Sequence, residues 1–373
     1  MSSKKGAITM NEQTNDLQAY MSQGIRRIVA DAARTALTHP AEAAFLARYA
    51  AASAKASSLR RRLEDEGTHV PPFLICSITS QCDLHCKGCY SRSNGATTDC
   101  APRDQLTAAE WDSVFTQAEA LGVGFILLAG GEPLLRRDVI EAAAAHDKIV
   151  FPIFTNGVFI NDAYFDLFDR ARCLLPVLSI EGDEARTDAR RGKGIYERQM
   201  RNMDALAARR ILFGVSVTVT KENLTQVLSR EFTQALAEKG CRVIIYVEYV
   251  PVTPETEALA PDDADRAYMT EHIAEMRREQ SPLLCLSFPG DEAAAGGCLA
   301  AGRGFFHINA RGGAEPCPFS PYSDTSLREV SLKDALGSPL FRRLAEDGIL
   351  SRPHTGGCVL FGECDAVEAR LHD

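Results

Sequence analysis

The sequence lacks the features that mark membrane-spanning, secreted or disulfide-stapled proteins. No stretch approaches 18 consecutive apolar residues, and the opening residues, MSSKKGAITMNEQTNDLQ, are polar and contain no apolar signal segment. The 12 cysteines among 373 residues fall well below the roughly 8–10% typical of disulfide scaffolds. We therefore expect a cytoplasmic protein with no membrane partner, in which cysteines serve metal binding or catalysis rather than disulfides.

An excess of positive charge is also missing. The chain has 41 Lys and Arg against 50 Asp and Glu, a net charge of −9. Broad electrostatic binding to nucleic acid needs a basic excess, so we expect no nucleic-acid partner. With 45% hydrophobic and 24% charged residues, the composition is that of a globular protein, and the length corresponds to two or three domains of about 150 residues.

Helical and apolar segments alternate along the middle of the chain. Residues 15–66 are rich in Ala, Leu, Arg and Glu and predict two helices, at 16–37 and 41–66. Six apolar strands follow, at 73–78, 124–129, 148–154, 173–180, 211–219 and 241–250, and helical segments separate them at 107–121, 137–147, 161–171, 195–209 and 223–239. Thr107 and Glu110 form a capping-box pattern at the start of the first of these helices. Buried strands that alternate with helices predict a parallel sheet or a barrel, with its chemistry at the carboxyl ends of the strands.

Three cysteines lie within eight residues, directly after the first predicted strand. Cys82, Cys86 and Cys89 have the spacing C-x3-C-x2-C. Three thiolates on a short loop can bind three corners of a cubane iron–sulfur cluster and leave the fourth iron open, whereas electron-transfer clusters normally have four cysteine ligands. The alternative is a zinc site with His85 as the fourth ligand.

This motif and the six strand–helix repeats resemble the radical S-adenosylmethionine (SAM) superfamily. The resemblance implies an α/β fold, with a partial (β/α)6 TIM-like barrel at 71–284 behind an N-terminal helical extension at 1–70. It also implies that the three cysteines hold a [4Fe–4S] cluster whose open iron chelates SAM. A low-potential donor such as ferredoxin or flavodoxin would reduce this cluster, and the resulting 5′-deoxyadenosyl radical would take hydrogen from a substrate. The family often has an aromatic residue where this chain has Gly88, so an aromatic side chain from that position is missing.

Polar motifs at the next strand ends resemble the family's SAM-binding segments. Gly130-Gly131-Glu132-Pro133 resembles the GGEP motif that contacts the SAM amino group. Thr155-Asn156-Gly157 and Ser179-Ile180-Glu181-Gly182 resemble segments near the ribose and carboxylate, and Arg191, or Arg190 in its place, is expected to pair with the carboxylate. The cofactor contacts that the resemblance implies come from Tyr90, Gly130, Gly131, Glu132, Asn156, Ser179, Glu181 and Arg191. At the end of the sixth strand, Glu248 is expected either at the substrate or at a solvated rim.

A second module is predicted at 285–373, where the alternation ends. The segments 304–309 and 314–319 predict a β-hairpin. Cys298, Gly312 and Cys317 have the spacing C-x13-G-x4-C, which resembles the opening of a SPASM/twitch auxiliary-cluster domain. Because only Cys358 and Cys364 follow, the resemblance implies the shorter twitch version, with one auxiliary [4Fe–4S] cluster on four cysteines. A four-cysteine zinc site is the alternative.

The remaining cysteines and the substrate are less defined. Cys76, Cys173, Cys241 and Cys285 lie in predicted strands and are expected to be buried packing residues, while Cys100 is ambiguous. The resemblance implies a radical SAM enzyme acting in peptide or protein modification or in cofactor maturation. Tetrapyrrole or small-metabolite biosynthesis is the alternative, so the substrate is a peptide or a small molecule. An iron–sulfur electron carrier or a zinc-binding module is a third possibility, which the open iron disfavours.

Overall fold

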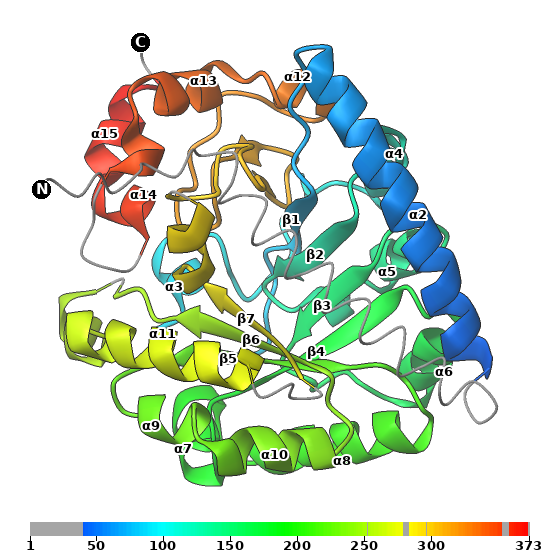
Figure 1. The fold of residues 1–373 in the computed structure, drawn as a ribbon, viewed down its shortest axis with the longest axis vertical. Coiled ribbons are helices and arrows are strands. Elements are labelled where there is room, and N and C mark those ends of the chain that lie inside the picture. The colour runs from blue at the N-terminus through cyan, green and yellow to red at the C-terminus, as the bar shows by residue number, and fades with distance from the viewer. Residues whose placement is uncertain (1–39, 252, 279–282, 296, 353–357, 372–373) are drawn as a thin grey trace, which may run out of the picture.

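The computed structural model describes residues 40–251, 253–278, 283–295, 297–352 and 358–371. The helix expected at 16–37 lies outside these residues. The helix expected at 41–66 is α2 (Pro40–Asp65), and it packs against α4 (Ala108–Leu121) on the outside of the fold (Figure 1). The Tyr49 hydroxyl of α2 donates to the carbonyl oxygen of Gly124 at 3.2 Å, which fixes the helix against the start of a strand.

A single curved sheet forms the centre of the molecule. Its strands lie in the order β7-β6-β5-β4-β3-β2-β1-β8-β9, and β1 to β7 all run parallel to their neighbours. The bounds are β1 (Phe73–Thr79), β2 (Phe125–Gly130), β3 (Phe151–Thr155), β4 (Leu174–Ile180), β5 (Gly214–Val219), β6 (Val243–Glu248), β7 (Leu284–Phe288), β8 (His307–Ile308) and β9 (Ala314–Glu315). The two edges, β7 and β9, do not pair, so the sheet is a partial barrel, as the sequence predicts.

Helices connect the parallel strands and cover the sheet (Figure 1). The predicted capping box of α4 is confirmed: the Thr107 side chain accepts from the Glu110 amide at 3.2 Å, and Glu110 accepts from the Thr107 amide at 2.7 Å. The other helices are α3 (Tyr90–Ser93), η1 (Pro133–Leu135), α5 (Arg137–Ala143), α6 (Asp162–Arg170), α7 (Glu184–Arg191), α8 (Ile195–Ala208), α9 (Leu224–Val227), α10 (Arg230–Glu238), η2 (Pro254–Leu259), α11 (Asp263–Arg278), η3 (Gly290–Ala295), α12 (Leu332–Ala335), α13 (Pro339–Glu346), η4 (Ile349–Ser351), α14 (Val359–Gly362) and α15 (Cys364–Ala369).

Two details differ from the sequence prediction. The helix expected at 223–239 is divided into α9 and α10, because Ser229 caps α10 by accepting from the Phe232 amide. A seventh parallel strand, β7, extends the six expected ones, and the predicted domain boundary at 284/285 falls inside it. Cys285 is expected in a strand, but this strand is only five residues long, so the sequence does not show that it continues the strand–helix series.

The C-terminal part of the chain continues the same sheet. The predicted hairpin is confirmed as β8 and β9, which pair antiparallel, and β8 pairs parallel with β1. The residues after β7 are therefore joined to the barrel through backbone hydrogen bonds at its first strand. This attachment brings the late cysteines to the side of the sheet where the early ones lie.

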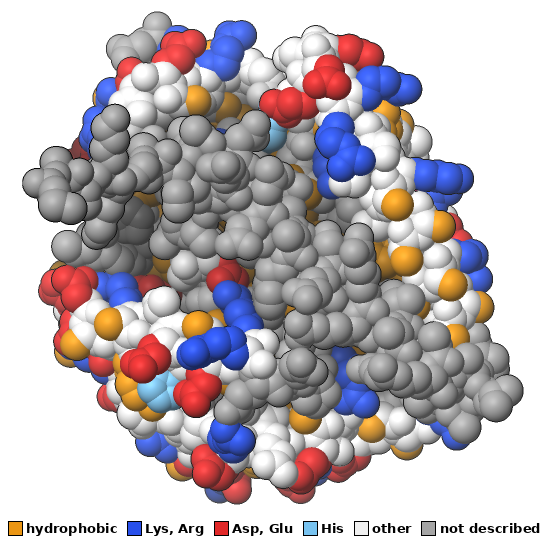
Figure 2. Space-filling view, in the orientation of Figure 1, with side chains coloured by type: hydrophobic (Ala, Val, Ile, Leu, Met, Phe, Trp, Pro, Cys, Tyr) orange, Lys and Arg blue, Asp and Glu red, His pale blue; other side chains and the backbone are white. Residues whose placement is uncertain are grey.

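The core consists of the apolar side chains of the strands and the inner faces of the helices. The four cysteines predicted to be packing residues are buried, which confirms that prediction; they are Cys76, Cys173, Cys241 and Cys285. Among the described residues, no helix is both long and apolar enough to cross a membrane. On the described part of the face drawn in Figure 2, acidic and basic side chains are interspersed around α2 and α11.

Candidate active site

The loop after β1 carries the three early cysteines into a cavity of about 400 Å³ at the mouth of the barrel. Cys82, Cys86 and Cys89 are each half-buried and line this cavity. The side chain of Arg92 holds the loop in place by donating to the carbonyl oxygens of Leu84 at 2.8 Å and of Cys82 at 3.0 Å. The loop therefore has a fixed shape that turns three thiols toward one space.

The zinc alternative at this loop is not favoured by the geometry. His85 is exposed, and its Nε2 lies 3.0 Å from an oxygen of Asp99. In the described part of the chain, no group of three or more His, Cys, Asp or Glu side chains is close enough to hold a single metal ion. A cubane cluster requires a wider spacing of the thiolates than a single metal ion does, because each thiolate binds a different iron atom.

The Gly-Gly-Glu-Pro turn packs directly on the cysteine loop. The Gly131 amide donates to the carbonyl oxygen of Thr79 at 2.8 Å, and the Glu132 amide donates to that of Gln81 at 2.7 Å. A Cβ atom on Gly130 would lie 2.2 Å from the Thr79 oxygen, and one on Gly131 would lie 2.0 Å from the Gln81 oxygen. Only glycine permits this close approach of two backbones, which brings the turn to the edge of the cavity.

Glu132 connects three strand ends and does not present a free carboxylate. It is buried, and its oxygens accept from the Leu134 amide at 3.0 Å, the Thr155 hydroxyl at 2.7 Å and the Asn156 amide at 2.8 Å. Burial raises the pKa of Glu132 to about 7. The side-chain amide of Asn156 donates in turn to Asp83 at 2.8 Å, on the cysteine loop. Glu132 thus fixes the shape of the turn and of the Asn156 segment relative to the cysteines.

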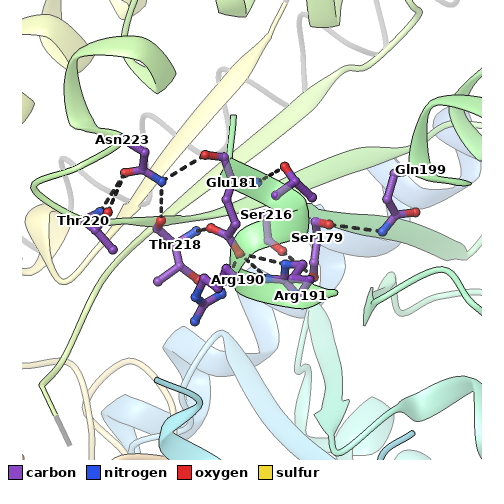
Figure 3. A network of polar contacts seen from close by, with 10 residues as sticks. Ser179, Glu181, Arg190, Arg191, Gln199, Ser216, Thr218, Thr220 and Asn223 are labelled. Carbon is purple, nitrogen blue, oxygen red and sulfur yellow. Dashed lines mark hydrogen bonds and ion pairs between the residues drawn. The ribbon is translucent and has the colours of Figure 1, made fainter. Parts of the chain in front are cut away.

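A second buried carboxylate organises the opposite side of the cavity (Figure 3). Glu181 is 2% exposed; its Oε1 accepts from Arg190 Nη1 at 2.5 Å and from Arg191 Nε at 2.8 Å, and its Oε2 accepts from the Thr218 amide at 3.0 Å. The carbonyl oxygen of Arg190 also accepts from the Lys87 amide at 2.8 Å, so this end of α7 contacts the cysteine loop. Both arginines line the cavity and share Glu181, so the geometry does not select Arg191 over Arg190.

Ser179 lies deeper on the same side. Its hydroxyl is 3.1 Å from that of Ser216, and its backbone carbonyl oxygen accepts from Gln199 at 3.2 Å (Figure 3). Both serines line the cavity. Their hydroxyls, on paired residues of β4 and β5, form a polar edge of the same space.

Tyr249 is a site residue that the sequence interpretation did not identify. It follows β6, is 3% exposed and lines the cavity, and its hydroxyl has no hydrogen-bond partner among the described residues. A Cβ atom on Gly88 would lie 2.3 Å from this hydroxyl, and Gly88 has a φ of 68°. The Tyr249 ring therefore occupies the space next to residue 88 where the family often has an aromatic side chain. The glycine itself was the signal that another residue fills that position.

The late cysteines gather at the same cavity, with one exception. Cys298 and Cys317 are buried, Cys358 is half-buried, and all three line the cavity. The thiols of Cys317 and Cys358 hydrogen-bond each other, which raises the pKa of Cys317 and lowers that of Cys358. Cys364 is exposed, lies 3.6 Å from Asp365 and does not line the cavity. The structure thus brings together three of the four cysteines predicted for an auxiliary cluster.

An aromatic contact joins the two cysteine groups. Tyr90, which follows Cys89, lines the cavity, and its ring centroid lies 4.3 Å from that of Phe319. Phe319 is two residues from Cys317. The predicted packing of Tyr90 near the cofactor therefore places its ring between the early and the late cysteines.

Comparison with known proteins identifies the class of the enzyme. Residues 76–230 match the Radical SAM superfamily. The chain is 26% identical over 336 residues to the AdoMet-dependent heme synthase of Methanosarcina barkeri, covering 82% of this chain and 93% of that protein. It is 26% identical over 321 residues to the mycofactocin maturase MftC of Mycobacterium ulcerans, covering 80% and 83%.

The fold agrees with this match. The crystal structure of Streptococcus suis SuiB bound to S-adenosylmethionine superimposes with a TM-score of 0.65 at 20% identity, covering 80% of this chain and 75% of SuiB. SuiB bound to its precursor peptide SuiA gives a TM-score of 0.63. The chain is therefore a radical SAM enzyme, of the superfamily that uses a [4Fe–4S] cluster and SAM. The two relatives matched by sequence are named as a synthase and a maturase.

The described residues fit a [4Fe–4S] cluster and SAM. Three thiols face one cavity, backbone from a glycine turn lies at its edge, and an unpartnered Tyr249 hydroxyl faces it. Soft thiolates suit iron–sulfur clusters, and the polar strand ends offer donors and acceptors for the amino acid and nucleoside parts of SAM.

Proposed function

We propose that this enzyme oxidises a peptide substrate held between two iron–sulfur clusters, one at each cysteine group. The observation that carries the proposal is that Cys82, Cys86 and Cys89 line the same cavity as Cys298, Cys317 and Cys358. A substrate in that cavity is within reach of both groups. An isolated electron carrier has no need of such a shared space, so the arrangement favours an enzyme.

The chain's own residues have distinct tasks in this proposal. When bound at the early cysteines, the [4Fe–4S] cluster supplies the electron that cleaves SAM to methionine and a 5′-deoxyadenosyl radical. Arg190 and Arg191, already positioned by Glu181, lie where they can orient the carboxylate of SAM. The backbone of the glycine turn, held by Glu132, offers carbonyl oxygens to its amino group. A low-potential donor such as ferredoxin or flavodoxin provides the electron.

In this proposal, a cluster at the late cysteines accepts the second electron of a two-electron oxidation of the substrate. Loss of a hydrogen atom to the 5′-deoxyadenosyl radical leaves a substrate radical, and release of one electron and one proton completes a two-electron oxidation. A cluster at the late cysteines is a suitable acceptor for that electron. Tyr90 and Phe319 place an apolar ring contact beside both groups.

A peptide fits the described cavity better than a polycarboxylate does. The three arginines that line it are already assigned: Arg190 and Arg191 pair with Glu181 and are proposed for the carboxylate of SAM, and Arg172 donates to the carbonyl oxygens of Asp169 and Arg210. MftC is named as a maturase, and SuiB has been crystallised with its precursor peptide SuiA.

Tetrapyrrole biosynthesis is the second candidate. It is favoured by the match to the heme synthase, which extends over 93% of that protein. A tetrapyrrole with propionate side chains would require cations near the cavity, and its binding would then involve rearrangement of the Glu181 pairs.

The two candidates are separated by what stimulates SAM cleavage. The reconstituted enzyme, with dithionite and SAM under anaerobic conditions, is incubated with a low-molecular-weight extract of the source organism, before and after protease treatment, or with an iron porphyrin carrying propionates. We expect the extract to stimulate 5′-deoxyadenosine formation and protease treatment to remove the effect. Stimulation by the porphyrin alone would favour the second candidate. Absence of any SAM cleavage by iron-loaded protein would contradict both.

A further inference from the structure

The late cysteines leave one position of a cubane cluster without a thiolate. Of the four late cysteines, Cys298, Cys317 and Cys358 line the cavity and Cys364 does not. The short helix α14 follows Cys358, and two of its residues, Val359 and Leu360, are buried and hold it in the core. Cys364 lies beyond this helix, exposed to solvent. Because the helix is anchored, Cys364 would have to pull buried side chains out of the core to reach the cavity.

A carboxylate already lies beside the three thiols. Glu292 is 9% exposed and lines the same cavity, and its Oε1 is 3.9 Å from the sulfur of Cys298. It also interacts electrostatically with Cys358. Cys317 and Cys358 interact with each other. Three thiols and one carboxylate therefore line the same cavity, linked by pairwise contacts.

The position of Glu292 is fixed by its neighbours. The residue before it, Asp291, accepts from Arg277 with both oxygens at 2.8 Å and from the Ser287 amide at 2.8 Å. The Glu292 amide donates to the carbonyl oxygen of Pro289 at 2.8 Å. These contacts tie η3 to the end of β7 and direct the Glu292 side chain toward Cys298. Glu292 accepts from the Leu299 amide at 3.4 Å, and the charge of Arg303 acts on it from nearby, so the carboxylate is held beside Cys298 and keeps lone pairs that an iron ion can bind.

We infer that Glu292, rather than Cys364, is the fourth protein ligand of the auxiliary [4Fe–4S] cluster. The inference rests on the proposed auxiliary cluster and deepens it. Cys298, Cys317 and Cys358 bind three irons, and a Glu292 oxygen binds the fourth. Carboxylate oxygen is a harder donor than thiolate sulfur, so this iron differs in electronic character from the other three.

The experiment uses the full chain with Cys82, Cys86 and Cys89 changed to alanine, so that only the auxiliary cluster remains. This background chain is reconstituted anaerobically, and iron, sulfide and the electron paramagnetic resonance spectrum are measured. We expect about four irons per chain, as one cubane requires. Three further variants are made in this background: Glu292→Gln, which keeps the size of the side chain, Glu292→Cys, which restores a thiolate, and Cys364→Ala, the matched control.

The variants distinguish Glu292 from Cys364 as the fourth ligand, because only loss of the true ligand changes the iron content or the spectrum. Glu292→Gln is expected to lose about one iron of four or to shift the resonance spectrum of the reduced cluster, while Cys364→Ala leaves both unchanged. Glu292→Cys is expected to restore about four irons with a spectrum different from that of the background chain. Circular dichroism confirms that each variant is folded.

Two results would overturn the inference. If Glu292→Gln keeps the iron content and the spectrum of the background chain, or if Cys364→Ala loses iron, Glu292 is not the ligand, although the auxiliary cluster stands. If the background chain itself binds no iron, the auxiliary cluster is absent, and the proposed function loses its second cluster together with the inference.

Discussion

The two cysteine groups that share the cavity are built in opposite ways. The early group occupies one loop of eight residues, and its thiols are half-buried. The late group draws its thiols from three segments between residues 298 and 358, and two of the three are fully buried. A ligand set on one loop can be recognised from its spacing, whereas a dispersed set depends on the fold to bring it together. The two groups also have different proposed tasks: the early group holds the cluster that cleaves SAM, and the late group holds a cluster that accepts an electron from the substrate.

The largest effect is expected from removing one cysteine of each group. Cys86→Ala should abolish SAM cleavage, because the early group holds the SAM-binding cluster in our assignment. Cys317→Ala should leave cleavage close to the rate of the unchanged enzyme but prevent conversion of substrate. The measurement is 5′-deoxyadenosine by chromatography, with and without substrate.

Cys100→Ala is the matched control for this pair, since Cys100 is exposed and does not line the cavity. Equal loss of SAM cleavage in Cys86→Ala and Cys317→Ala would show that the two groups do not divide the work as proposed.

A stability experiment tests how the early site is supported. Glu181 is almost fully buried between Arg190 and Arg191, so Glu181→Gln leaves two guanidinium groups without their carboxylate (Figure 3). We expect the free energy of unfolding of the apo-protein to fall by about 3–5 kcal/mol, as for other buried ion pairs that lose one partner. Urea unfolding measures this change.

The exposed Glu184, in the first turn of α7, provides the control. Glu184→Gln should cost less than about 1 kcal/mol, because it loses only a helix-dipole contribution. Similar losses for the two variants would mean that the Glu181 network does not support the early site in the way its burial indicates.

The sequence predicted the early half of the molecule well because its information is local. The apolar strands, the Thr107–Glu110 capping box and the cysteine spacing each lie within about one element of the chain, and the fold places them as expected. The roles of Glu132 and Glu181 were not visible, because their partners come from other strands. Tyr249 was missed for the same reason, since its contact with Gly88 crosses the barrel mouth.

The late half was predicted only in part. The hairpin was found from its turn, but its pairing with β1 depends on long-range contacts that no local pattern contains. Cys364 is expected as a ligand from the sequence because it is a nearby cysteine, whereas the ligand that we infer, Glu292, is a single glutamate in an Ala-rich segment with no distinguishing pattern. The distance between Glu292 and Cys298 appears only in three dimensions.

A pH experiment tests the buried carboxyl of Glu132 in the early region, and because burial also raises the pKa of Glu292 in the late region to about 7, a variant is needed to isolate the share of Glu132. Burial raises the pKa of Glu132 from 4.5 to about 7 in the folded chain. Between these values the unfolded chain releases the proton while the folded chain keeps it, so the free energy of unfolding should fall as the pH rises. The expected decrease is about 3 kcal/mol between pH 4.5 and pH 7. Urea unfolding of apo-protein at several pH values measures it.

The control for the pH experiment is Glu132→Gln, which cannot titrate. The measured quantity is the slope of the free energy of unfolding against pH. In Glu132→Gln this slope should be less steep than in the unchanged chain, because one titrating carboxyl is absent. An overall loss of stability that is the same at every pH does not affect this comparison. An identical slope in both chains would assign the pH dependence to other groups and would leave the early region without a titrating carboxylate.

The smallest expected effect concerns the contact between the two regions, where the Tyr90 ring packs on Phe319. A double-mutant cycle with Tyr90→Leu and Phe319→Leu should give a coupling energy of about 1 kcal/mol, typical of an aromatic pair. Tyr90→Phe should preserve the coupling, because the rings and not the hydroxyl make the contact. A coupling near zero would mean that this ring pair does not link the early and late regions, and that the pairing of β8 with β1 and other contacts, such as Leu332 with Gln117, join them instead.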